Sequence, residues 1–96
     1  MKLVSITKSD RAGKKLKAVF READGSQRTT HFGAEGYSDY IQHGDKGRRS
    51  NYLSRHKTNE NWSSPTTAGS LSRWILWGNS TSLRANIADF RKRFRL

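Results

Sequence analysis

Apolar and polar residues alternate in the first third of the chain, a pattern typical of β-strands with one buried face. The segment "KLVSITKS" at 2–9 is rich in β-branched residues and predicts a short strand. Gly13 ends a predicted turn over 10–13. Residues 14–33 then predict a β-hairpin. The N-terminal part of the chain therefore predicts a small antiparallel sheet.

The predicted hairpin has Asp24-Gly25 at its centre, between arms at 15–21 and 27–32. Asp-Gly between two such arms is a strong signal for a two-residue loop. That loop length places Phe20 opposite Thr29, and it puts Phe32 on the other face of the sheet with Val19. The apolar face then carries the alternating residues Leu16, Ala18 and Phe20. A sheet with one apolar face is expected to be covered by helices on that side.

Helical spacing begins after residue 36. The segment "YSDYIQH" at 37–43 places Tyr37, Tyr40 and Ile41 on one stripe, which predicts a short helix. Residues 45–61 predict a second helix with Asp45 as N-cap. Because this second segment contains few apolar residues, most of its surface is expected to be solvated.

Two further helices are predicted in the last third. Ser64-Pro65 is an N-terminal helix signature, and the helix is expected to run to Trp77 and stop at Gly78. Its apolar face would place Trp74 in the core beside Leu71 and Ile75. The last helix starts near Thr81 or Ser82 and has a regular apolar stripe, formed by Leu83, Ile87, Phe90 and Phe94.

These elements predict an α+β fold in one small domain, residues 1–96, with a β part at 1–33 and a helical part of three or four short helices at 37–96. The three tryptophans fall close together within the helical part. Trp62 is expected to pack over the start of the helix that follows it. Trp77 fits the edge of the core or a contact with a partner, and a tryptophan near arginine can also stack on nucleic-acid bases.

The net charge of the chain indicates a class of function for this fold. The 96 residues carry a formal net charge of +11. Residues 1–43 have a net charge of +3 and residues 44–96 a net charge of +8, so the helical part holds most of it. Such charge density implies an anionic partner: nucleic acid, an acidic protein surface or anionic lipid headgroups.

The candidate binding residues lie in two basic clusters, "KGRRSNYLSRHK" at 46–57 and "RKRFR" at 91–95. Each cluster alone could equally be a solvated helix face, but two in one half of a short chain favour binding. The predicted partner- or nucleic-acid-binding residues are Arg48, Arg49, Arg55, Lys57, Arg84, Arg91, Lys92, Arg93, Arg95, Trp62 and Trp77.

Signals for catalysis are nearly absent. The glycines match no nucleotide-binding loop, and the eight carboxylates are scattered. The three histidines, His31, His43 and His56, meet no metal-ligand spacing. We therefore predict no catalytic residue, metal, cofactor or small-molecule substrate. No apolar run has the length of a membrane span or a signal peptide, which predicts a soluble protein made in a cytosol-like compartment.

Three segments, "HFGAEGYSDY" at 31–40, "RHKTNENWSSPTTAGSLSRWILWG" at 55–78 and "LRANIADFRKRF" at 83–94, carry a resemblance. The chain resembles a family of small basic proteins of nucleocytoplasmic large DNA viruses of algae and protists, of the phycodnavirus and mimivirus kind. That family is a domain of unknown function and brings no catalytic residues. The resemblance implies a viral origin, and with it either a minor structural role in the virion or association with DNA.

The expected function is a non-enzymatic virion component, a minor capsid or cement-type protein that binds larger capsid proteins or other virion proteins. It would be made in the host cytoplasm, with the nucleus or a virus factory as further sites, and would end in the virion. The alternative is a small nucleic-acid-binding protein that packages or accompanies DNA. An enzyme with an unrecognised site is the third hypothesis.

Overall fold

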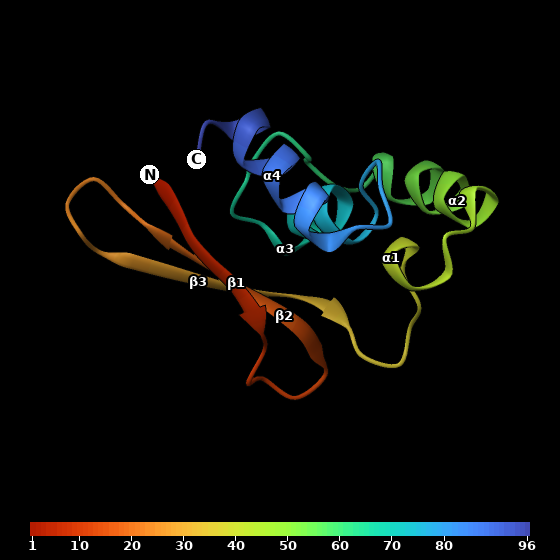
Figure 1. Ribbon diagram of the computed structural model, residues 1–96, viewed down its shortest axis with the longest axis horizontal. Helices are drawn as coiled ribbons and strands as arrows, with labels where there is room; N and C mark the ends of the chain where they lie inside the picture. The colour runs from red at the N-terminus through yellow and green to blue at the C-terminus, as the bar shows by residue number, and fades with distance from the viewer.

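The computed structural model describes all residues, 1–96, as an N-terminal three-stranded antiparallel sheet followed by helices (Figure 1), and it confirms the predicted α+β class. The sheet has the order β1-β2-β3, and no helix is long and apolar enough to cross a membrane. The elements are β1 (Lys2–Lys8), β2 (Lys14–Arg21), β3 (Gln27–Ala34), α1 (Tyr40–His43), α2 (Lys46–Lys57), α3 (Ala68–Leu71), the π-helix η1 (Ser72–Leu76) and α4 (Leu83–Phe94).

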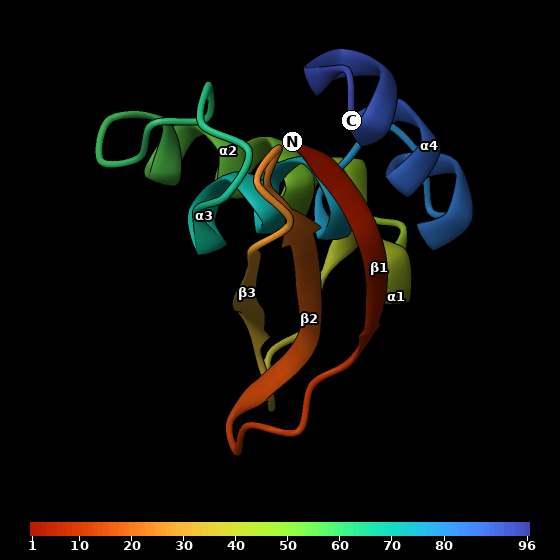
Figure 2. The ribbon, with the colours of Figure 1, turned by 90° about the vertical axis from the view of Figure 1, so that its left-hand side faces the viewer.

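Helices cover one face of the sheet and leave the other open. In Figures 1 and 2, α3, η1 and α4 lie over the sheet, while α1 and α2 extend beyond its end. The apolar core lies between these two layers. It consists of Leu3, Ala18, Phe20 and Phe32 from the sheet with Leu71, Ile75, Leu76 and Phe90 from the helices, all of them at most 5% exposed.

The hairpin forms as predicted, but its predicted register is wrong by one residue. The Glu22 N–H donates to the Ser26 carbonyl at 2.8 Å, and Gly25 between them has a φ of +88°. The loop therefore contains three residues, with glycine in the left-handed position that such loops require. Phe20 faces Arg28, not Thr29. The shift moves Phe32 onto the same face as Phe20, where it is fully buried.

The helix predicted from residue 37 begins later. Asp39 caps α1: its carboxylate accepts from the Gln42 N–H at 3.2 Å, and the Gln42 side chain accepts in return from the Asp39 N–H. Tyr37 precedes this cap and is 74% exposed, so its place on the predicted stripe is wrong. The predicted N-cap of α2 is confirmed, because the Asp45 carboxylate accepts from the Gly47 and Arg48 N–H groups.

The helix predicted from Ser64-Pro65 starts at Ala68, where the Thr67 side chain provides the N-cap. Residues 65–66 instead form a turn against β3, because Thr30 Oγ1 donates to the Thr66 carbonyl at 2.8 Å. The helix then widens into η1, in which the Trp77 N–H donates to the Ser72 carbonyl at 2.9 Å.

The wide turn of η1 changes which residues face the core. Five-residue hydrogen bonding adds a residue to the turn. Leu76 thereby joins Leu71 and Ile75 in the core, whereas Trp74 packs against the core but is only half-buried, so its predicted core position is confirmed in part.

The last helix agrees with its prediction. Ser82 caps α4 by accepting from the Ala85 N–H at 3.2 Å, and the predicted stripe packs on the core with Phe90 fully enclosed. Asn86 is also fully buried on this helix. Its side-chain amide donates to the carbonyls of Ile75 at 2.9 Å and Ser80 at 2.7 Å, which ties α4 to the end of η1.

Candidate binding groove

A groove of about 1020 Å³ lies between the end of the sheet and α2. One wall is formed by α2, whose Arg48, Asn51 and Arg55 are spaced to share a helix face. Lys14 and Lys15 at the start of β2 contribute to the opposite side. The groove therefore brings two of the predicted binding residues, Arg48 and Arg55, together with cations from the sheet.

The carboxylates that line the groove are already paired. Asp39 lies 2.7 Å from the Lys15 ammonium group, and this ion pair is largely buried. Glu60 accepts from the Trp62 indole N–H at 2.9 Å and also contacts the His56 ring.

The remaining cations of the groove are free. Lys14, Arg48 and Arg55 make no salt bridge and no side-chain hydrogen bond. With Asp39 paired to Lys15, the groove holds the three free cations against the single carboxylate of Glu60, so it presents a net positive charge to a ligand.

An aromatic stack forms the inner part of this region. The Tyr52 ring lies between Trp77 and His56, each with its ring centre 4.2 Å away, and it is nearly parallel to Trp77 at 3°. His43 contacts Trp77 at 5.3 Å. Burial, followed by the nearby Glu60 carboxylate, raises the pKa of Tyr52. The stack covers both faces of Tyr52 and one face of Trp77, and Trp77 is half-buried where it borders the groove.

Arg49 serves the fold and not the groove. Its Nε donates to the carbonyls of Trp77 at 3.2 Å and Gly78 at 2.8 Å, and its Nη2 donates to Asn79 Oδ1 at 3.0 Å. These bonds satisfy carbonyl groups at the end of η1 and fasten α2 to it. The structure thus separates Arg49 from its predicted partners Arg48 and Arg55.

A second basic region lies on α4. We define the α4 surface as the exposed side chains of Arg84, Lys92 and Arg95. Arg91 is half-buried and donates to the Leu3 carbonyl at 2.8 Å, which links α4 to β1. Lys57 is exposed at the end of α2, outside the groove. The predicted residues therefore divide between two places on the molecule.

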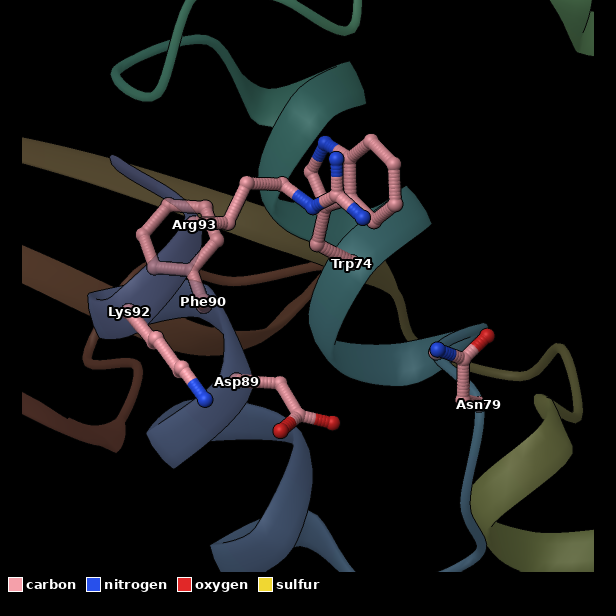
Figure 3. A pocket seen from close by; sticks show the side chains of 7 residues that line it. Trp74, Asn79, Asp89, Phe90, Lys92 and Arg93 are labelled. Carbon is pink, nitrogen blue, oxygen red and sulfur yellow. The ribbon is translucent and has the colours of Figure 1, made fainter. Parts of the chain in front are cut away.

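Two arginines lie over Trp74, and Figure 3 shows one of them, Arg93. The guanidinium carbons of Arg93 and Arg73 lie 3.8 Å and 4.1 Å from the centre of the indole ring. Arg73 also lies over the Trp62 ring at 5.2 Å. Burial, with Arg49 and Arg93 nearby, lowers the pKa of Arg73 to about 10. A cavity of about 400 Å³ adjoins Arg93 and Trp74.

Sequence reasoning missed the roles of Lys14 and Arg73. Lys14 continues the alternation of Leu16, Ala18 and Phe20 back to the start of β2, so its side of the sheet was readable from the sequence. Arg73 had no such signal, because the π-helical turn decides where it points. No three histidine, aspartate or glutamate side chains approach one another closely enough to hold a metal ion.

Comparison with known proteins identifies the family. Residues 4–56 match the model of a family of unknown function, DUF5754. The chain belongs to this family. The DUF5754 match covers the sheet, α1 and nearly all of α2, so it includes both cationic sides of the groove but ends before the tryptophans.

A relative supports the same assignment. The chain is 36% identical over 81 residues to the uncharacterized protein L851 of Acanthamoeba polyphaga mimivirus, an alignment that covers 77% of this chain and 80% of the relative. The resemblance to small proteins of large DNA viruses is thereby confirmed. No solved structure matches the chain.

Proposed function

We propose that this DUF5754 protein is a non-enzymatic structural component of the virion, a minor capsid or cement-type protein that joins larger virion proteins through their acidic surfaces. The similarity to a mimivirus protein supports a viral setting. The charge of the molecule supports anionic partners, since Lys14, Arg48 and Arg55 in the groove and the cations of the α4 surface form no intramolecular ion pair.

The observation that carries the proposal is the separation of the two basic regions. The molecule extends 42 × 28 × 25 Å, and α2 and α4 lie apart in both Figure 1 and Figure 2. The groove beside α2 and the cationic surface on α4 can contact two partners at once. A protein that holds larger proteins together needs this bivalent arrangement, because joint attachment raises avidity without new contacts at either site.

The aromatic residues favour a protein partner over nucleic-acid bases. Binding of single strands relies on open aromatic faces. Here Tyr52 and Trp77 stack on each other, and arginines cover Trp74. The free cations that remain are suited to carboxylates on a partner's surface.

Peptide mass spectrometry of purified, nuclease-treated virions tests the proposal. We expect the chain at a constant ratio to the larger capsid proteins, and crosslinks from Lys14 and Lys92 to different partner surfaces. Reversing the groove charges (Arg48→Glu with Arg55→Glu) should remove the first crosslink only. Absence of the chain from such virions would refute the proposal.

Binding to double-stranded DNA through phosphates is the second candidate. It is favoured by the exposed cations outside the groove, Lys57 and the α4 surface, which have no acidic partner within the chain. Such binding would weaken steeply with salt, because each neutralised phosphate releases counterions. No DNA binding at about 50 mM salt, where electrostatic binding is strong, would rule it out.

A further inference from the structure

The groove has the two sides that an extended polypeptide would need. Arg48 and Arg55 are seven residues apart on α2, a rise of about 10 Å along the helix axis. Leu76 and Tyr52 belong to the same lining but are at most 8% exposed, so the accessible apolar surface of the groove comes from Ala34, Ala68 and the edge of Trp77. A volume of about 1020 Å³ is at the upper end of the range for ligand pockets and has room for several residues.

Side chains of an extended chain point alternately to opposite sides, with neighbours on one side about 7 Å apart. A segment lying along α2 would therefore direct every second side chain toward Arg48 and Arg55. The intervening side chains would face Ala34, Ala68 and the edges of the aromatic stack. The flexible arginine side chains can adjust to carboxylates two or four residues apart.

We propose that the groove binds an extended segment of a partner protein in which acidic residues alternate with small apolar ones. This inference rests on the proposed function and names the kind of partner that the groove accepts. Carboxylates contact Arg48, Arg55 and Lys14, and the apolar side chains cover Ala34 and Ala68. The segment leaves the ion pair of Lys15 and Asp39 intact, because that pair already satisfies both groups.

A single-stranded nucleic acid fits the same groove less well. It would bring phosphates to the cations, but its bases would find few open aromatic faces. Tyr37 is the exposed aromatic residue at the groove, whereas Tyr52 and Trp77 are stacked on each other. One free ring supports little stacking along a strand.

The test uses the whole chain and a fluorescent peptide in which glutamate alternates with alanine and valine. Fluorescence anisotropy at about 50 mM salt, where electrostatic contacts are strong, should detect binding. Arg48→Glu with Arg55→Glu should weaken binding by at least about tenfold, because two attractive contacts become repulsive. The matched control, Lys92→Glu with Arg95→Glu on the α4 surface, should leave binding unchanged.

Three comparison probes make the result decisive. A peptide with its glutamates in one block and a peptide alternating glutamate with serine should both bind more weakly than the first. An oligothymidylate of equal charge should compete poorly. Equal binding of the block peptide, stronger binding of the oligothymidylate, or no peptide binding would each overturn the inference.

The folded state of the variants is checked separately. Both substituted arginines are exposed, so the charge-reversed chain should keep the circular dichroism spectrum and unfolding midpoint of the original. Failure of the peptide test does not decide the proposed function, since presence of the chain in purified virions is measured independently. If the chain is present in virions but does not bind the alternating peptide, only the partner assigned to the groove is refuted.

Discussion

The two ends of the molecule are held together by different physical means. Between the sheet and α3, η1 and α4, apolar side chains form a continuous buried core. Around α1 and α2 the buried aromatic residues are Tyr40 and Tyr52, and directional contacts replace the core. These contacts are the three hydrogen bonds of Arg49, the stack on Trp77 and the ion pair of Lys15 with Asp39.

The difference indicates that the two regions have different roles. A core tolerates little change in volume, so that part of the molecule sets stability. The contacts that hold α2 are few and mostly polar, so α2 can be loosened while the core stays folded. Because α2 forms one wall of the groove, stability of the whole and integrity of the groove should be separable by mutation.

The largest expected effect is in the core. Phe20 is fully buried, and Phe20→Ala should lower the free energy of unfolding by about 3–5 kcal/mol, most of the stability of a small domain. Val19, next to it on β2, belongs to the open face, and Val19→Ala should cost far less. Chemical denaturation measures both. Similar losses for the two variants would show that the sheet is not one-sided.

Much of this core followed from the sequence. Alternation predicted that Ala18 and Phe20 share a face, and helical spacing predicted the stripe of α4. Phe32 was misplaced because the loop length decides the register. Gly25 allows a three-residue loop as readily as a two-residue one, and the choice depends on contacts of Asp24 with Ser26 that no periodicity reveals.

The groove was less predictable for a similar reason. The α2 cations were identified by charge alone, and charge could not separate Arg48 and Arg55, which are free, from Arg49, which binds carbonyls at the end of η1. Those carbonyls lie where they do because of a π-helical turn. Local sequence patterns describe α-helical and β spacing, so an inserted turn residue shifts every orientation after it. Through this shift, Trp74 lies nearer the surface than its spacing predicted.

The second effect in size concerns the attachment of α2. Arg49→Ala should lower the free energy of local opening of α2 by about 2 kcal/mol, because charge-assisted hydrogen bonds to half-buried carbonyls are lost. Hydrogen exchange should show faster exchange in α2 and unchanged protection in the sheet. The neighbouring Arg48→Ala is the control and should change neither. Uniform loss of protection across the chain would mean that α2 and the core unfold together.

A smaller effect is expected where arginines cover Trp74. A double-mutant cycle with Trp74→Leu and Arg93→Ala should give a coupling of about 0.5–1 kcal/mol, the size of an exposed cation–π contact. Leucine keeps apolar bulk, and we expect that variant to remain folded because Trp74 is only half-buried. The matched cycle with Lys92→Ala should give no coupling. Coupling of equal size for Lys92 would indicate general electrostatics in place of ring contact.

The smallest effect lies in the hairpin loop, where a polar contact is fully exposed. Hydrogen bonds from the Ser26 hydroxyl and N–H hold the pKa of Asp24 below its ordinary value of 3.8. A lowered carboxyl pKa means that the charged form stabilises the folded state, so its contribution is present above pH 3.8 and is lost as the pH falls below that value. Ser26→Ala should raise the Asp24 pKa in an NMR titration, whereas Ser26→Thr, which keeps the hydroxyl, should not. An unchanged pKa in the alanine variant would leave the backbone N–H as the dominant contact. Even then, the exposed loop would differ from the Arg49 site. In the loop, the contact of Asp24 with Ser26 selects the register of the hairpin, whereas the hydrogen bonds of Arg49 fix the position of the whole helix α2.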